Sequence, residues 1–143
     1  MIDLSCMCAN FRRASRALTQ MYDQELRPEG LRATQFTILQ ALTLAGEVTQ
    51  GQLGGVLAID STTLTRTLKI MRRDGWVKMS RGEDRREWRL GLTKEGEAIY
   101  KRALPAWERT QKKIRTRIGR TEWEQMMKLT NRLTQAVVEG GEQ

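Results

Sequence analysis

The side chains best suited to chemistry lie between Ser61 and Arg73, where hydroxyl groups and cations occur together without an acid. The cations are Arg66, Lys69, Arg72 and Arg73. An arginine can donate two hydrogen bonds to the edge of a guanine, and a threonine can contact a phosphate or the methyl group of thymine. A cationic helix in a basic protein is typical of nucleic-acid binding, although charge alone leaves a solvated helix face as the alternative.

The composition argues against most other chemistry. The 143 residues include 25 lysines and arginines, 17 aspartates and glutamates and no histidine, for a formal net charge of +8. Without histidine, Ser-His-Asp and Cys-His arrangements and every histidine-containing metal site are excluded. No apolar run approaches the roughly 18 residues that span a bilayer. We therefore expect one basic, cytoplasmic domain that has no cofactor or metal, does not bind membranes and is not an enzyme.

Helical patterns cover most of the chain and would position these side chains. Apolar residues recur at helical spacing, and the expected helices are 3–26, 34–46, 50–57, 61–74, 93–118 and 121–137. Side-chain oxygens at their starts can accept hydrogen bonds from free first-turn amides. The expected caps are Thr34, Thr49, Asp60 or Ser61, Thr93 and Thr121, the last with Glu124 in a capping box. We expect Pro105 to kink the long helix near residues 101–104.

A pair of strands follows the cationic helix. In residues 88–92 large apolar side chains alternate with Arg89 and Gly91, which is the period of a half-buried strand, and residues 76–80 supply the partner. The loop between them contains Arg81, Arg85 and Arg86. Short helix, turn, cationic helix, strand, basic loop and strand is the order of a winged helix-turn-helix. The predicted fold class is mainly α with a small β-hairpin wing (α+β).

Each part of this arrangement suits double-stranded DNA. The cationic helix places Thr62, Arg66, Lys69 and Arg73 on one face and Leu64, Leu68 and Met71 on the other. The major groove admits one helix, backbone amides at helix starts suit phosphates, and the wing loop brings arginine to the narrow minor groove. The candidate DNA-binding residues are Thr49, Gln50, Ser61, Thr62, Thr63, Thr65, Arg66, Lys69, Arg73, Arg81, Arg85 and Arg86.

Several short motifs together resemble the MarR family of bacterial transcription regulators. They are Thr49-Gln50-Gly51-Gln52-Leu53, the stretch from Asp60 to Leu68, Gly75-Trp76-Val77, Glu83-Asp84-Arg85-Arg86 and the stretch from Leu90 to Gly96. The family's wing pattern is Asp-x-Arg, an apolar strand and Leu-Thr-x-x-Gly, matched by Asp84, Arg86, Leu92, Thr93 and Gly96. The resemblance implies that Arg86 enters the minor groove and that Asp84 positions the wing arginines through an ion pair. Asp84 therefore joins the candidate DNA-binding residues.

The resemblance extends over the whole chain and implies a homodimer on a pseudo-palindromic operator. Residues 1–143 would form one MarR-like domain, with a winged lobe at 32–96 and dimerisation helices at 1–27 and 97–143. Such a regulator, most often a repressor, would be released by a small ligand, such as an aromatic one, or by cysteine oxidation. The ligand pocket is expected between the dimer helices and the lobe. The alternative is an architectural DNA-binding protein without an inducer, which a low ratio of specific to random DNA binding would identify.

Two cysteines, Cys6 and Cys8, are expected in the first helix. Residues two apart on a helix point about 200° apart, so a disulfide between them requires unwinding. One branch of the family senses organic hydroperoxides through a first-helix cysteine. Cys8 and Tyr22 match its pattern, whereas Arg12 and Ala33 replace two tyrosines. A helix start and a nearby arginine favour the thiolate, so Cys8 and Cys6 are candidate redox sensors; the alternative is that both are small apolar or exposed residues.

Overall fold

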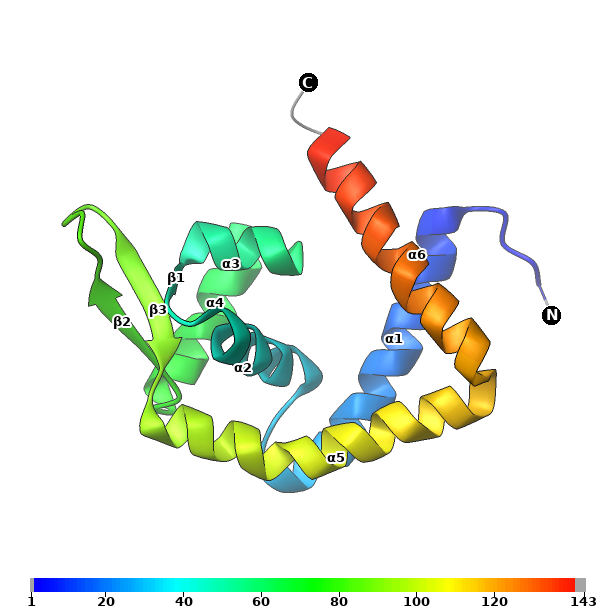
Figure 1. Cartoon of the computed structure of the whole chain (residues 1–143), viewed down its shortest axis with the longest axis horizontal. Helices are drawn as coiled ribbons and strands as arrows, with labels where there is room; N and C mark the ends of the chain where they lie inside the picture. The colour runs from blue at the N-terminus through cyan, green and yellow to red at the C-terminus, as the bar shows by residue number, and fades with distance from the viewer. Residues whose placement is uncertain (1, 141–143) are drawn as a thin grey trace.

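The computed structural model describes residues 2–140. These residues form a winged lobe and a part made of helices alone. The elements are α1 (Met7–Leu26), the 3-10 helix η1 (Arg27–Glu29), α2 (Ala33–Ala45), β1 (Val48–Thr49), α3 (Gln50–Leu57), α4 (Ser61–Arg73), β2 (Val77–Arg81), β3 (Trp88–Leu92), α5 (Lys94–Ile118) and α6 (Arg120–Glu139). Figure 1 shows α2, α3, α4 and the sheet at one end, α1 and α6 at the other, and α5 running along both. The predicted α fold with a small β wing is confirmed.

The winged lobe closes around a three-stranded antiparallel sheet in the order β1-β3-β2. The hairpin was predicted, but β1 was not; it pairs Val48 with Leu90 and adds a third strand on the far side of β3. Val77 of β2 pairs with Leu92. The core combines side chains of α2, α3, α4 and the sheet with others from α5 and the end of α1. Its fully buried side chains include Ile38, Leu39, Leu64, Met71 and Leu90.

Helix caps agree with the sequence where the capping bond is local. Thr49 caps α3 by accepting a 3.1 Å hydrogen bond from the amide of Gln52. Asp60 caps α4 and Thr93 caps α5 in the same way, through the amides of Thr63 and Gly96 at 3.0 Å. These three predicted caps are confirmed, because each bond joins residues only three apart and needs no tertiary contact.

Three predicted helix starts are wrong. α1 begins at Met7 rather than residue 3. α2 begins at Ala33, before the expected cap Thr34, with Arg32 as its N-cap. Gln35 accepts a 3.0 Å hydrogen bond from the amide of Arg32, and Asp23 near the end of α1 accepts a 2.7 Å hydrogen bond from the amide of Ala33. α6 begins at Arg120 with Gly119 as its N-cap, so Thr121 lies inside the helix and caps nothing. The start of α2 is therefore fixed by one local bond and one bond to the preceding helix, and the start of α6 by the turn at Gly119, whose φ is +97°.

The long helix α5 runs unbroken through Pro105 and joins the two parts of the molecule (Figure 1). Pro105 is exposed, whereas Ala103 and Ala106 are buried between α5 and the helices packed on it. At its start, Gly96 leaves room for the carbonyl of Trp76, which would lie 2.1 Å from a Cβ at this position. This close approach fixes α5 against the end of the hairpin.

The two terminal helices leave apolar side chains uncovered. The sequence predicts that the last helix buries its apolar residues, yet none of its described residues is buried within one chain. Exposed apolar residues on α1 and α6 include Met7, Phe11, Leu18, Met126, Met127, Leu129, Val137 and Val138. Of the described helices, none is long and apolar enough to cross a membrane.

Candidate nucleic-acid interface

The helix pair α3–α4 presents the cationic face that the sequence predicts. Leu64, Leu68 and Met71 are at most 3% exposed and hold α4 against the lobe. The opposite face carries Thr62, Arg66, Lys69 and Arg73, all exposed. Arg73 also lies 3.4 Å from the carboxylate of Asp74, a surface ion pair of little energetic weight. The separation of apolar and cationic faces is therefore confirmed, and the polar face is free to meet a groove.

The turn between α3 and α4 is tight. Ala58 has a left-handed backbone with φ +51°, a conformation that costs an L-residue other than glycine energy. Just before it, Gly54 packs closely, because a Cβ there would lie 3.3 Å from the carbonyl oxygen of Ile59 and 3.4 Å from Leu64. The glycine-rich α3 thus packs against the following turn and α4.

The carboxylate of Asp60 caps the start of α4. The carboxylate of Asp60 accepts the amide of Thr63, and this hydrogen bonding holds the pKa of Asp60 below its ordinary value. Ser61, Thr62 and Thr63 are exposed in the first turn of α4. Because Asp60 satisfies one of the first-turn amides, the remaining amides and hydroxyl groups are those available to a phosphate.

A side-chain bond ties the two helices together at the candidate interface. Nε2 of Gln50, the first residue of α3, donates a 2.7 Å hydrogen bond to Oγ1 of Thr65 in α4. Thr49, also expected to contact DNA, is half-buried and its hydroxyl accepts the amide of Gln52. The structure therefore brings Thr49, Gln50 and Thr65 together, with part of their hydrogen-bonding capacity used inside the protein.

The wing loop is closed by its own backbone. The amide of Gly82 donates to the carbonyl of Glu87 at 3.0 Å, and the amide of Glu87 donates to the carbonyl of Asp84 at 2.9 Å. The carboxylate of Asp84 accepts the backbone amide of Arg86 at 3.0 Å. The expected ion pair between Asp84 and a wing arginine is wrong for the residues described, because the turn places the Arg86 amide, not a guanidinium, against this carboxylate. Asp84 thus shapes the loop that carries Arg86.

The three wing arginines have different surroundings. The guanidinium of Arg81 lies over the ring of Trp88, 4.6 Å from its centroid, and donates to the carbonyl of Arg85. Trp88 remains 47% exposed although the alternation suggested a half-buried strand. Arg85 and Arg86 are exposed in the loop, and among the described residues neither guanidinium forms an ion pair. The two loop arginines are the ones left available to a phosphate or a groove.

Sequence reasoning missed Arg89 and Glu47. Arg89 of β3 donates a 2.9 Å hydrogen bond to the carbonyl of Glu47, just before β1, and lies 3.9 Å from the carboxylate of Glu87. The hydrogen bond from Arg89 to Glu47 connects the strand pair to the segment that leads into α3. The two residues are 42 positions apart, so no local spacing could have revealed it.

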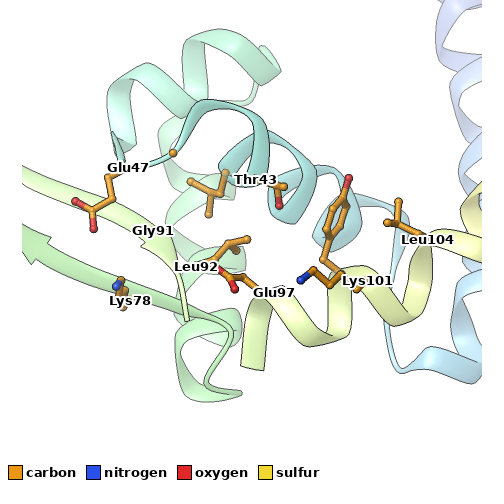
Figure 2. A pocket seen from close by; sticks show the side chains of 11 residues that line it. Thr43, Glu47, Lys78, Gly91, Leu92, Glu97, Lys101 and Leu104 are labelled. Carbon is orange, nitrogen blue, oxygen red and sulfur yellow. The ribbon is translucent and has the colours of Figure 1, made fainter. Parts of the chain in front are cut away.

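A cavity of about 530 Å³ lies where α2, the sheet and α5 meet. Leu42, Leu92, Leu104 and Tyr100 supply apolar walls, and Glu47, Lys78, Glu97 and Lys101 supply two negative and two positive charges. Figure 2 shows Glu47 and Lys78 on the sheet side and Lys101 and Leu104 along α5, with Leu92 between them. The volume lies within the range of about 300–1,000 Å³ that is usual for small-molecule sites.

The two cysteines differ in backbone environment. Cys6 is the N-cap of α1 with extended backbone angles, φ −83° and ψ 117°, whereas Cys8 lies in the first turn. Both are exposed and free. The expectation that both lie in the helix is wrong for Cys6, because the helix starts four residues later than predicted. The argument that a disulfide between them must unwind the helix assumed that both are helical, and Cys6 lies outside the helix.

Comparisons with known proteins agree with this architecture. Residues 31–88 match the MarR family. The chain is 36% identical over 87 residues to the uncharacterized HTH-type transcriptional regulator YwoH of Bacillus subtilis, an alignment that spans 61% of this chain and 64% of the relative. It is 33% identical over 81 residues to the multiple antibiotic resistance protein MarR of Salmonella typhimurium, over 56% of each chain. The chain thus spans somewhat more than half the length of these curated relatives.

Solved structures extend the likeness beyond the winged lobe. The Mycobacterium tuberculosis transcriptional regulator MosR, solved in complex with DNA, superposes with a TM-score of 0.86 at 37% identity, over 97% of this chain and 100% of that one. A C80S mutant of Escherichia coli MarR, solved with operator DNA, has a TM-score of 0.80 at 22% identity, over 89% and 92%, and shows the fold alone. YwoH and MosR are transcriptional regulators, in agreement with a protein that is not an enzyme. On these grounds the chain belongs to the MarR family.

Proposed function

We propose that the protein is a cytoplasmic, homodimeric repressor that binds double-stranded DNA at a pseudo-palindromic operator. The observation that carries the proposal is the exposed cationic face of α4, backed by buried leucines and flanked by a wing with two free loop arginines. In this arrangement α4 enters the major groove and the loop approaches the minor groove. The similarity over 97% of the chain to a regulator solved with DNA supports the same reading.

The uncovered terminal helices support the dimer. Leu129 of α6 is 57% and Met7 of α1 62% exposed in one chain, and large apolar side chains left exposed in number on two helices favour an interface there. A second copy related by a two-fold axis covers both helices and spaces two α4 helices by about 34 Å, one turn of DNA. Leu129→Glu should therefore yield monomers in sedimentation, whereas Leu44→Glu, a charge placed on the exposed α2 side chain of the lobe, should leave a dimer. A dimeric Leu129→Glu protein would contradict this interface.

The cavity beside α5 supports release by a small ligand. Its apolar walls suit an aromatic ring, and Lys78 and Lys101 can pair with a ligand carboxylate. Glu47 lines this cavity, and its carbonyl accepts Arg89 of the wing strand. A ligand that displaces Glu47 would thus shift the segment leading into α3. Benzoate is a simple probe: it should weaken DNA binding by the wild type and less so by Lys101→Ala.

Cysteine oxidation is the second route of release that we propose. An organic hydroperoxide would transfer one oxygen to the Cys8 thiol, which becomes a sulfenic acid, and would itself be reduced to its alcohol. Exposure of both cysteines at the start of α1, a helix of the dimer interface, supports the route. Cys8→Ser should keep DNA binding after peroxide treatment that releases the wild type. If the two proteins release DNA alike, Cys8 is not the sensor, and Cys6→Ser tests the other thiol.

The deciding experiment is a fluorescence-anisotropy titration of the duplex upstream of the protein's own gene. It is run in reductant with excess random-sequence competitor, then repeated with benzoate or cumene hydroperoxide. Binding that resists the competitor supports a sequence-specific regulator, since specific sites typically bind at least about 1,000-fold tighter than random DNA. Equal binding to both duplexes would instead support the alternative of an architectural protein without an inducer.

A further inference from the structure

One wing arginine is engaged with the wing itself. Arg81, the last residue of β2, faces Trp88, the first residue of β3, in the strand register. Its guanidinium lies 4.6 Å from the centroid of the Trp88 ring. It also donates a hydrogen bond to the backbone carbonyl of Arg85, inside the loop. A single side chain thus links the base of the wing to its tip.

We propose that Arg81 is a positioning residue that holds the wing loop in the conformation in which Arg85 and Arg86 are presented to DNA. The proposal rests on the function proposed above, because it assigns a role within the same interface. It differs from the expectation for Arg81 drawn from the sequence, which was direct contact with DNA. The stack on Trp88 and the bond to the loop are the observations that carry it.

Arg81 adds to a set of hydrogen bonds that together hold the wing loop. The bonds from Gly82 to Glu87 and from Glu87 to Asp84 close the loop at its base and on the Glu87 side. The carboxylate of Asp84 then fixes the amide of Arg86. Arg81 adds a bond to the carbonyl of Arg85, the residue directly before Arg86. A loop already held in its bound shape loses less conformational freedom when it meets DNA.

The stack is suited to this task. An arginine over a tryptophan face is attracted by the ring, and a planar guanidinium can stack and donate sideways at the same time. Arg89, the other arginine of the strand pair, donates its hydrogen bond to the carbonyl of Glu47 and lies 3.9 Å from the carboxylate of Glu87 at the base of the loop. Arg81 is thus the strand arginine that bonds to the backbone of Arg85, and Arg85 and Arg86 keep their guanidinium groups for DNA.

The first test needs no DNA. Hydrogen exchange is measured at the amides of Gly82, Arg86 and Glu87 in the free protein. Arg81→Ala should speed exchange at these amides about two- to fivefold, the factor that corresponds to losing an exposed cation–π contact, while the amides of α2 and α5 keep their rates. Trp88→Ala should do the same and Trp88→Phe should largely restore the wild-type rates.

Arg85→Ala is the matched control for charge. It removes one cation from the same loop but leaves the Arg85 carbonyl and the Arg81–Trp88 stack in place, so the exchange rates should stay as in the wild type. Wing amides that exchange at wild-type rates in Arg81→Ala would overturn the proposal. This outcome is independent of whether the protein binds any duplex.

The second test asks whether Arg81 acts on DNA through the loop. Arg81→Ala should weaken binding by a factor of about 2 to 10, but have little further effect in a chain that already carries Arg85→Ala and Arg86→Ala, because residues acting together are not additive. Equal factors in both backgrounds would mean that Arg81 contacts phosphate directly, and would overturn the proposal. Failure of the wild type to bind DNA would refute the proposed function, while the exchange rates would still decide the role of Arg81.

Discussion

Nε2 of Gln50 and Oγ1 of Thr65 lie 2.7 Å apart and join the first turn of α3 to the middle of α4. The two residues are 15 positions apart and come from the two helices of the helix-turn-helix. Both were expected to contact DNA as separate groups. Their bond instead joins them into one unit. The side-chain amide of Gln50 orients the hydroxyl of Thr65, and the side-chain oxygen of Gln50 can still accept a hydrogen bond from an outside donor.

Breaking this unit should loosen the helix pair. Gln50→Ala or Thr65→Val should each lower the free energy of unfolding by about 0.5–1.5 kcal/mol, the usual net worth of one hydrogen bond. The double variant should cost less than the sum, because the second change removes a group whose partner is already gone. Urea unfolding of the four proteins measures this coupling. Strictly additive costs would show that the bond contributes nothing to stability.

The cap of α4 should make stability depend on pH. Hydrogen bonds from Thr63 hold the folded-state pKa of Asp60 below its ordinary value of 3.8. A lowered carboxyl pKa contributes stability that is fully present above the unfolded value and is lost as the pH falls through the folded value. Asp60→Ala should therefore unfold at lower urea than the wild type at pH 7, and the gap between them should close in acid below about pH 4.

Asp60→Asn is the control for this prediction. The amide oxygen can still accept the Thr63 amide, so α4 keeps a cap that does not titrate. Its difference from Asp60→Ala should then stay constant across the same pH range. A gap between the wild type and Asp60→Ala that is equally wide at acid pH would show that the Asp60 carboxylate is not what stabilises α4.

Gly96 and Gly55 make a matched pair. A Cβ at Gly96 would lie 2.1 Å from the carbonyl oxygen of Trp76, whereas one at Gly55 meets nothing within 4 Å. Gly96→Ala should destabilise the fold by about 1–3 kcal/mol or more, because backbone must move. Gly55→Ala should stabilise it by about 1 kcal/mol, the gain in helix propensity. Thermal unfolding of both variants checks the signs, and a stable Gly96→Ala protein would contradict the close packing of α5 on the hairpin.

Replacing Arg66 distinguishes a contact with a base edge from a contact with a phosphate. On the exposed face of α4, with Leu64 and Leu68 buried behind it, it should donate to a base edge. Arg66→Ala should weaken binding by about 1–3 kcal/mol on the operator and relax the preference at one base pair. Anisotropy titrations on operator variants and on random duplex measure this. An equal loss on all duplexes would assign Arg66 to the phosphate backbone.

Part of the architecture could be predicted because it depends on neighbours along the chain. The caps at Thr49, Asp60 and Thr93 are bonds between residues three apart. The two faces of α4 follow from the pitch of a helix. The start near Thr34 was wrong partly because Asp23, ten residues away, accepts the amide of Ala33, which no local pattern reveals. The start near Thr121 was wrong because the local turn at Gly119 makes that glycine the N-cap, a role that the sequence analysis gave to a hydroxyl group.

The same distinction between local and tertiary contacts holds for the candidate site. The sequence by itself determined which residues are cationic, which face of α4 they share and that a basic loop lies between two strands, since helix and strand periods set these relations. Only the tertiary structure decided that β1 joins the sheet, that Arg89 reaches Glu47, that Arg81 stacks on Trp88 instead of standing free, and that a cavity forms beside α5. The physical reason is that β1, Glu47 and the walls of the cavity come from segments far apart along the chain, which meet only when burial of the shared core brings them together. The Arg81–Trp88 stack depends on the strand register that puts these two residues opposite each other, and strand period alone does not set that register.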